Sequence, residues 1–489
     1  MAARIVRPVA ASITTAAVLA GCASTTPDPQ ALLRQADQAL GASSLQTLHY
    51  SARGTGATFG QAYQPGNDWP ALNYASFTRT IDYGRAAMRE DFARSRAEPT
   101  GGGALPLMGE GEQRASAFSL GEQAWTLAGA TATPSLVSVD DRVHALWTTP
   151  HGAIKSAQQH GASTGTRSEG GVSHSTFSWR VPGRMEATAW VDAQGRITRI
   201  DSRMPHPVLG DAEFTTHYSD YRAFGPIHFP MQIRQTQDGR PIFALQVLQV
   251  QPNAPADIVL PDNVRSTTAE RVLSEQVAPG VWFLFGGSHN SVAIEMSNHV
   301  VLVEAPLYEG RTAAVFAEVK KLLPGKPIRT VINSHHHFDH AGGLRAAVAA
   351  GASLVTSQQA KPYFERVLAQ GSRVRPAAGA VRAPEVFGVQ SRREFVDGER
   401  RFEVHEITGS VHAQGFLMVY LPKEKLLVEA DAYTPAAPNT APPAVPNGNH
   451  VNLVQNIERL GLQVERILPL HGRVVPIGEL YTGIGRTRP

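Results

Sequence analysis

Cysteine is almost absent from this chain: Cys22 is the only one among 489 residues. A single thiol excludes an internal disulfide, and it leaves no cysteine elsewhere for thiol catalysis or for a cysteine-ligated metal site. A large excess of charge of one sign is also lacking, since the formal net charge at pH 7 is +3. No stretch rich in lysine and arginine alternates with aromatic residues, so a nucleic-acid partner is not expected.

Long hydrophobic runs are lacking too, because no stretch approaches the roughly 20 apolar residues that cross a bilayer. A shorter uncharged run at 9–19 follows two arginines and predicts a signal peptide over residues 1–21. Residues 19–22 (Leu-Ala-Gly-Cys) resemble the lipobox of bacterial lipoproteins. This resemblance implies cleavage before Cys22 and lipidation of its thiol. We therefore expect a lipid anchor at the periplasmic face of a bacterial membrane, with the outer membrane favoured by Ala23.

The length of the chain predicts two or three domains, because single hydrophobic cores stop growing at about 250–300 residues. A polar tether is expected at 22–30, and a β-rich amino-terminal domain at 31–250. Residues 251–268 are rich in proline, alanine, aspartate and asparagine without periodicity, which predicts a linker. The remaining residues, 269–489, form the second predicted domain.

The amino-terminal domain is expected to be mostly antiparallel β, as a curved sheet or half-barrel. Strand-like segments flank several turn signals, of which Asp238-Gly239 is the strongest. Two helices are predicted, one at 31–40 ending at Gly41 and one near 150–160. Residues 50–106 show only weak periodicity and receive no assignment.

One stretch of this domain, 218–239, resembles the end of periplasmic lipoprotein-carrier domains. It contains Tyr-Ser-Asp-Tyr at 218–221 and Gly-Pro-Ile-His-Phe-Pro at 225–230, followed by the hairpin turn. Those carrier domains are half-open barrels with an apolar groove. The resemblance implies an apolar ligand in this domain, which otherwise shows no catalytic constellation.

The second domain carries a dense histidine motif. The pattern His-x-His-x-Asp-His is formed by His335, His337, Asp339 and His340. An apolar strand is predicted at 330–333, and the glycine pair at 342–343 opens a helix. Open α/β sheets bind ligands at the carboxyl ends of their strands. Because imidazole and carboxylate are ligands that zinc prefers, the motif predicts a metal site.

This motif follows a predicted hairpin and a helix at 311–323, and in that order it resembles the metallo-β-lactamase superfamily. The family fold is an αβ/βα sandwich with its metals at one edge. The resemblance implies three further ligands, and a candidate stands at each expected place: His412, Asp431 and His471. Ala430 replaces the glycine usual before the aspartate.

Two zinc ions are implied by the resemblance, although other divalent first-row metals remain open. The first zinc is expected on His335, His337 and His412, and the second on Asp339, His340 and His471, with Asp431 bridging them. A one-metal site on the first three histidines is the alternative. In this family Asp339 would also orient the attacking hydroxide, which makes it the expected catalytic residue.

Metal-bound hydroxide predicts hydrolysis of an ester, thioester, lactone or phosphoester-like bond in a small-molecule substrate. Asp431 stands where some β-lactamases have cysteine, so a hydrolase of the broader superfamily is preferred, with a β-lactamase as an alternative. A second alternative is a lipid- or lipoprotein-binding protein with an auxiliary metal domain. Substrate contacts are expected from His289, Asn290 and His450, whereas His336 and His405 are interpreted as structural.

Overall fold

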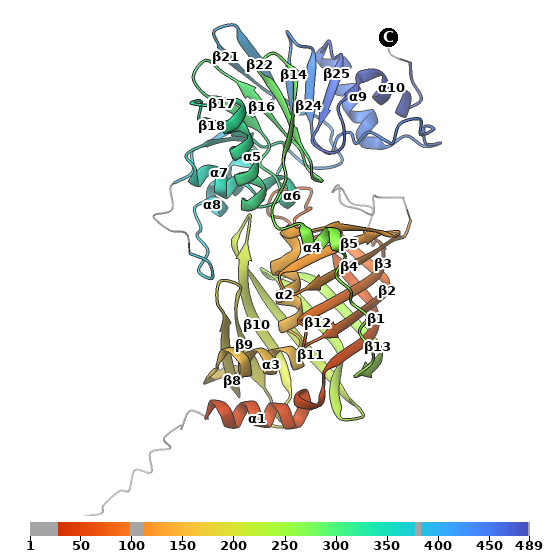
Figure 1. The fold of residues 1–489 in the computed structure, drawn as a ribbon, viewed down its shortest axis with the longest axis vertical. Helices are drawn as coiled ribbons and strands as arrows, with labels where there is room; N and C mark the ends of the chain where they lie inside the picture. Colours follow the sequence, from red (N-terminus) through yellow and green to blue (C-terminus); the bar gives the residue numbers. More distant parts are fainter. Residues whose placement is uncertain (1–27, 98–110, 377–382, 488–489) are drawn as a thin grey trace, which may run out of the picture.

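The computed structural model describes residues 28–97, 111–376 and 383–487, which form the two units visible in Figure 1. The predicted signal peptide and Cys22 lie outside the described residues. Within the described ranges, no helix is both long enough and apolar enough to span a membrane.

The amino-terminal unit is one thirteen-stranded antiparallel sheet, in the order β6-β5-β4-β3-β2-β1-β13-β12-β11-β10-β9-β8-β7. The first strand pairs with the last, and β6 and β7 form the two edges. The strands are β1 (Thr47–Ala57), β2 (Ala71–Asp82), β3 (Ala87–Arg96), β4 (Gln113–Leu120), β5 (Gln123–Ala128), β6 (Thr131–Pro134), β7 (Ser163–Glu169), β8 (Val172–Val181), β9 (Met185–Val191), β10 (Ile197–His206), β11 (Gly210–Phe224), β12 (Ile227–Gln237) and β13 (Arg240–Pro252). The expected curved antiparallel sheet is therefore confirmed.

Helices α1 (Pro29–Leu40), α2 (Val139–Trp147) and α3 (Pro150–His160) pack against this sheet. Helix α2 contacts β3, β4 and β5 as well as β10, so the sheet curves around it (Figure 1). The two predicted helices are confirmed: α1 ends at Gly41, whose φ of 71° suits glycine, and α3 begins with Pro150.

The unassigned stretch 50–106 contains most of β1 and all of β2 and β3, which lie near the centre of the sheet. Its pattern is weak because only part of each strand alternates between buried and exposed residues. In β1 the alternation lapses after Ala52. Tyr50 and Phe77 are buried there, and their rings lie 6.2 Å apart.

The connection between the units is folded onto the large sheet. Helix α4 (Asp262–Ser266) contacts β5 and β6, and Ile258 and Val264 are buried in a small cluster with Phe118 and Trp125. The predicted linker thus runs along the amino-terminal unit before the second unit begins.

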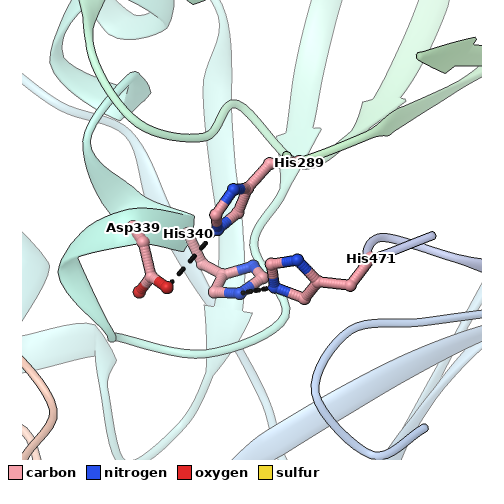
Figure 2. A group of neighbouring side chains, drawn as sticks. All are labelled: His289, Asp339, His340 and His471. Carbon is pink, nitrogen blue, oxygen red and sulfur yellow. Dashed lines mark hydrogen bonds and ion pairs between the residues drawn. The ribbon is translucent and has the colours of Figure 1, made fainter. Parts of the chain in front are cut away.

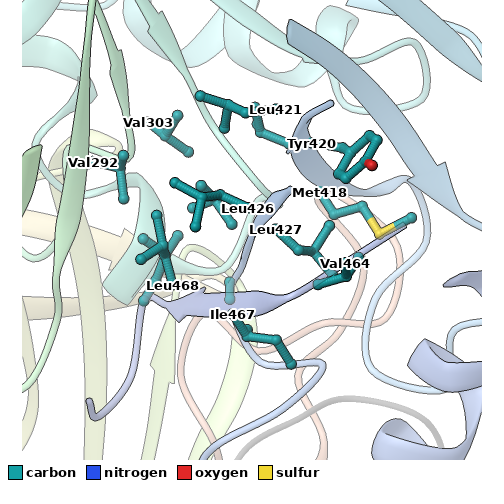
Figure 3. Packing of buried hydrophobic residues seen from close by; sticks show 14 of the residues in the cluster. Val292, Val303, Met418, Tyr420, Leu421, Leu426, Leu427, Val464, Ile467 and Leu468 are labelled. Carbon is teal, nitrogen blue, oxygen red and sulfur yellow. The ribbon is translucent and has the colours of Figure 1, made fainter. Parts of the chain in front are cut away.

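The carboxyl-terminal unit is a sandwich of two sheets. The seven-stranded sheet contains β14 (Leu273–Ala278), β15 (Val281–Phe285), β16 (Ser291–Glu295), β17 (Val300–Val303), β18 (Ile328–Ile332), β19 (Ser353–Ser357) and β20 (Val386–Val389). The six-stranded sheet contains β21 (Arg392–Asp397), β22 (Arg400–Ile407), β23 (Phe416–Leu421), β24 (Leu426–Glu429), β25 (Arg466–Pro469) and β26 (Val475–Pro476). Side chains from both sheets, such as Val303 and Leu426, pack against one another between them (Figure 3).

Helices cover both outer faces of the sandwich. Helices α5 (Glu309–Leu322), α7 (Leu344–Ala349) and α8 (Lys361–Leu368) share a core with the first sheet. Helices α9 (Gly448–Leu460) and α10 (Ile477–Gly483) pack with the second sheet. This is the predicted αβ/βα arrangement, and the short helix α6 (Phe338–Ala341) lies where the two units meet (Figure 1).

Candidate metal centre

Two groups of histidine and carboxylate side chains meet at one edge of the sandwich. Within each group, one ligand atom from every residue lies within 4.8 Å of the others. The first group is His335, His337, His412 and Asp431, and the second is His289, Asp339, His340 and His471. The seven residues expected from the sequence thus come together, and His289 joins them.

Strand ends position these side chains. The parallel strand β18 ends at Ile332, directly before the loop that carries His335 and His337. Asp431 follows β24 and His471 follows β25, which pair in parallel, so both strands end at the same edge. The loop between β22 and β23 brings His412 from the same sheet. Side chains far apart in sequence therefore converge because neighbouring strands end together.

Hydrogen bonds to residues around the second group set the tautomers of two of its histidines. Nδ1 of His340 lies 3.1 Å from Oε2 of Glu304, and Nδ1 of His471 lies 3.0 Å from the carbonyl oxygen of Ser288. Because these acceptors have no hydrogen, each Nδ1 carries one. The two Nε2 atoms face each other at 3.0 Å (Figure 2), so both rings point toward one place at which a metal ion could be held.

The first group shows the same arrangement. The hydroxyl of Ser334 donates to Glu304 over 2.5 Å, so it accepts from Nδ1 of His335 at 2.9 Å. Nε2 of His335 then presents its lone pair to Nε2 of His412, 3.1 Å away. Nδ1 of His337 is buried without a hydrogen-bond partner and remains available as a ligand atom.

Asp431 stands between the two groups. Its Oδ1 lies 3.0 Å from Nε2 of His340 and 2.8 Å from Nε2 of His471. Its Oδ2 lies 2.9 Å from Nε2 of His412 and 3.8 Å from Nε2 of His335. One oxygen per group is the arrangement that a bridging carboxylate requires, and the donor set as a whole fits two divalent cations.

Neighbouring charges and burial shift the pKa values of the candidate ligands in different directions. Burial alone would lower the pKa of His340, but Asp431 and Asp339 outweigh it and raise this pKa well above its ordinary value. Burial would raise the pKa of Asp431, yet His340 and His412 reverse the effect and hold it well below the usual range. Burial lowers the pKa values of His335 and His337, which keeps both rings neutral and able to bind a metal.

Glu304 is a functional residue that the sequence analysis missed. It is fully buried directly after β17 and accepts from Ser334, His340 and Asn333, whose Nδ2 lies 2.9 Å away. Its φ of 71° is rare for a residue with a side chain, and such strain is found where a side chain must be held in place. In the sequence, Glu304 is visible only as a carboxylate that follows an apolar strand. This pattern occurs in too many proteins to indicate a role at a metal centre.

The three residues expected to contact substrate have different surroundings. Nε2 of His289 lies 3.3 Å from Oδ2 of Asp339, within the second metal group. Both amide hydrogens of Asn290 are donated to the carbonyls of Pro469 and Gly472, so this side chain holds the loop of His471. His450 packs against Tyr433, and burial lowers its pKa to about 4. Substrate contact by these residues stays a prediction.

The two histidines interpreted as structural are both buried. His405 lies in β22, where its Nε2 is 2.8 Å from Glu403, outside the two metal groups. His336 lies between two ligands, and its Nε2 donates to the carbonyl oxygen of Ala62 over 2.8 Å. His336 therefore donates to the amino-terminal unit, while its ring lies against that of the ligand His337, with 5.1 Å between the centroids.

A cavity of 1310 Å³ between the two units reaches the metal centre. Its lining includes Asp339, His412, Asp431, His471 and His450 on one side. On the other side it includes apolar residues of the amino-terminal unit, among them Phe59, Leu136, Val137, Met204 and Phe214. A substrate at the metal centre would thus also contact the amino-terminal unit.

Comparison with protein families places a match on the carboxyl-terminal unit. Residues 284–469 match the family described as the metallo-beta-lactamase superfamily. Over 200 residues the chain is 26% identical to the 2,4-dinitroanisole O-demethylase subunit alpha of Nocardioides sp. (strain JS1661). That match covers 40% of this chain and 57% of the relative, so the chain spans little more than half of the relative's length.

Solved structures similar to the chain include three metallo-β-lactamases. The enzyme from Pontibacter korlensis shows 17% identity and a TM-score of 0.35, and covers 44% of this chain and 98% of its own. The enzyme from Hirschia baltica shows 20% identity and a TM-score of 0.34, and the match covers 45% of this chain and 99% of the Hirschia chain. FIM-1 from Pseudomonas aeruginosa, in its mono-zinc form, shows 18% identity and a TM-score of 0.34. That match covers 44% of this chain and 95% of the FIM-1 chain.

Proposed function

Since the carboxyl-terminal unit has the metallo-β-lactamase fold, we propose that this protein is a zinc-dependent hydrolase with a dinuclear site. The bond cleaved is an ester, thioester, lactone or phosphoester-like bond. The observation that carries the proposal is the position of Asp431, with one carboxylate oxygen turned to each group of ligands. A purely structural metal site would need fewer ligands and no shared carboxylate.

When bound, two divalent ions would activate water near neutral pH and polarise the oxygen of the scissile bond. The residues of the chain hold this site in order. Glu304 keeps a hydrogen on Nδ1 of His340, so that Nε2 faces the centre. Asp339 stays ionised, because His340 and the hydrogen bond from His289 outweigh its burial and lower its pKa. Its Oδ2 would accept a hydrogen from the attacking water and orient it.

The substrate is proposed to be a small molecule with an apolar part. Support comes from the cavity, whose amino-terminal wall includes Met204 and Phe214 while its other end reaches Asp431. The apolar ligand expected for the amino-terminal unit would then be part of the substrate itself. If the screen below finds binding without turnover, the cavity instead supports the second candidate, a lipid-binding protein with an auxiliary metal domain.

The test is metal analysis of the purified protein combined with a hydrolysis screen. The screen contains lactones, thioesters, carboxylic esters, phosphodiesters and β-lactams with short and long acyl chains. An aryl methyl ether is included because of the similarity to the O-demethylase subunit. We expect about two metal equivalents per chain and turnover that a chelator abolishes and zinc restores. A metal-free protein, or turnover unaffected by chelation, would contradict the proposal, and preference for β-lactams would favour the β-lactamase alternative.

We also propose that the mature protein is anchored through Cys22 to the periplasmic face of the outer membrane. The support is the lipobox-like sequence at 19–22. Mass spectrometry of the amino-terminal peptide should find a chain that begins at a diacylated Cys22. An intact Met1, or an unmodified thiol, would rule out the anchor, and fractionation of the Cys22→Ser variant should show its release from membranes.

A further inference from the structure

The segment between β1 and β2, residues 58–70, extends from the large sheet to the metal centre; we call it the capping loop. Three consecutive residues contact two of the segments that carry ligands, the one with His337 and Asp339 and the one with His412. Nε2 of Gln61 donates to Oδ1 of Asp339 over 2.9 Å. The carbonyl of Ala62 accepts from Nε2 of His337 at 3.0 Å. The carbonyl of Tyr63 accepts from the backbone amide of Gln414 at 2.8 Å, two residues after His412.

The bond to Ala62 decides which nitrogen of His337 can bind a metal. A carbonyl oxygen only accepts, so Nε2 of His337 carries the hydrogen and Nδ1 keeps the lone pair. That Nδ1 is the atom that is buried without a partner. A backbone carbonyl of the amino-terminal unit therefore orients a ligand of the first metal group.

Gln61 acts in the same way on the second group. Its side-chain amide holds Oδ1 of Asp339, while Oδ2 of the same carboxylate lies 3.3 Å from His289. Gln61 is itself buried, with 8% of its surface exposed, whereas the side chain of Asp339 is 33% exposed, and both residues line the cavity. The capping loop thus contacts ligands of both metal groups.

The loop is held closely against the centre. Gly60 has a φ of 70°, and a Cβ atom there would lie 2.2 Å from the ring of Phe338. Trp69 and His206, also from the amino-terminal unit, make edge contacts with the same ring, at 5.9 Å and 4.8 Å between centroids. Phe338 stands between the ligands His337 and Asp339, so its position is coupled to theirs.

We propose that the capping loop is a positioning element of the metal centre, in which Gln61 orients Asp339 and the carbonyl of Ala62 orients His337. The inference rests on the proposed metal site. Hydrogen bonds to metal ligands fix the ring or carboxylate orientation, and their loss typically costs about 10–100-fold in metal affinity. The amino-terminal unit accordingly forms part of the metal centre, in addition to lining one side of the cavity.

The test compares substitutions of Gln61 in the full-length protein loaded with zinc. The rate of zinc release to a chromophoric chelator is the main measurement. Gln61→Ala should release one of the two zinc equivalents about tenfold faster, because Asp339 loses its fixed orientation. Gln61→Glu should release it faster still, since a second carboxylate would face Asp339. Gln64→Ala, an exposed glutamine of the same loop, should behave like the parent.

A second variant addresses the backbone contact. Gly60→Ala should displace the loop from Phe338 and accelerate release of both zinc equivalents, with thermal unfolding measured alongside to separate misfolding from local change. Parental release rates in Gln61→Ala and Gln61→Glu, with two zinc ions bound to the parent, would overturn this inference alone. A parent that binds no metal would instead overturn the proposed function.

Discussion

The two units of the molecule contribute to the metal centre through different chemistry. The carboxyl-terminal unit supplies imidazole and carboxylate side chains, which only a few residue types can provide. The amino-terminal unit supplies the amide of Gln61 and the backbone carbonyl of Ala62. Because every residue has a carbonyl, the second kind of contribution leaves no mark in the residue pattern. A unit without any catalytic motif can therefore still be part of an active site.

The two units also pack against each other beside the metal centre. On the amino-terminal side, the turn between β10 and β11 places Val208 among the buried residues of the carboxyl-terminal core. The guanidinium of Arg345 donates to the carbonyl of Val208 over 2.9 Å. The two units are thus joined by packed side chains as well as by the capping loop. These contacts fix the position of the cavity relative to the metal centre.

The largest expected effect tests the contribution of the carboxyl-terminal unit. Asp431→Asn keeps the shape of the side chain but removes the charge that serves both metal groups. We expect turnover to fall by about 100-fold or more and metal content to drop below the parental value. Metal analysis and steady-state kinetics measure both, and circular dichroism checks that the fold is retained.

The matched control for that variant is His405→Gln, which changes a buried histidine of β22 outside the metal groups. It should leave metal content and turnover unchanged. If Asp431→Asn retains two metals and parental turnover, Asp431 is no bridge, and a one-metal site on His335, His337 and His412 becomes the better interpretation.

A smaller effect is expected at Glu304, which supports the ligands without binding a metal. In Glu304→Gln one oxygen becomes an amide group, which cannot accept from Ser334, His340 and Asn333 together. Zinc affinity should fall by about 10–100-fold, measured by competition with a chelator. Glu318→Gln on α5, where the carboxylate accepts from Ser274, is the control and should match the parent. Equal affinities in the two variants would show that Glu304 does not orient the ligands.

The smallest effect concerns the amino-terminal unit by itself and its stability to acid. Burial lowers the pKa of His144 to about 3 and that of His151 to about 4. Unfolded histidine has a pKa near ~6.5, so the unfolded chain takes up these protons first. The contribution of each histidine to the free energy of unfolding is present above pH ~6.5 and decreases below it, by about 1.4 kcal/mol per pH unit.

Urea unfolding between pH ~4.5 and ~7.5, followed by tryptophan fluorescence, measures this dependence. Five of the six tryptophans, all except Trp282, lie in the amino-terminal unit and report on it. His151→Gln should flatten the pH dependence, whereas His160→Gln, at the exposed end of the same helix, should not. A parental slope in His151→Gln would show that His151 takes up no proton on unfolding in this range.

Different parts of the fold were predictable to different degrees. The carboxyl-terminal sandwich was expected from the resemblance to the metallo-β-lactamase superfamily, and an apolar strand such as 416–421, which is fully buried between a glycine and a proline, could be recognised directly. The central strands β1 to β3 were not recognised, because their polar and small residues are covered on one face only in part. Burial there depends on how far the sheet curves, and no local pattern records that curvature.

The sequence by itself determined the chemistry of the metal centre. His335 belongs to the histidine motif itself, and the expected places of His412, Asp431 and His471 followed from the resemblance to the metallo-β-lactamase superfamily. Only the tertiary structure decided what surrounds them: the buried carboxylate of Glu304, the place of His289 beside Asp339, and the capping loop. These contacts join residues up to 278 positions apart through hydrogen bonds that many residue types, or any backbone, can make. Their specificity lies in position, which is set by the folding of the carboxyl-terminal unit for Glu304 and His289 and by the packing of the two units for the capping loop.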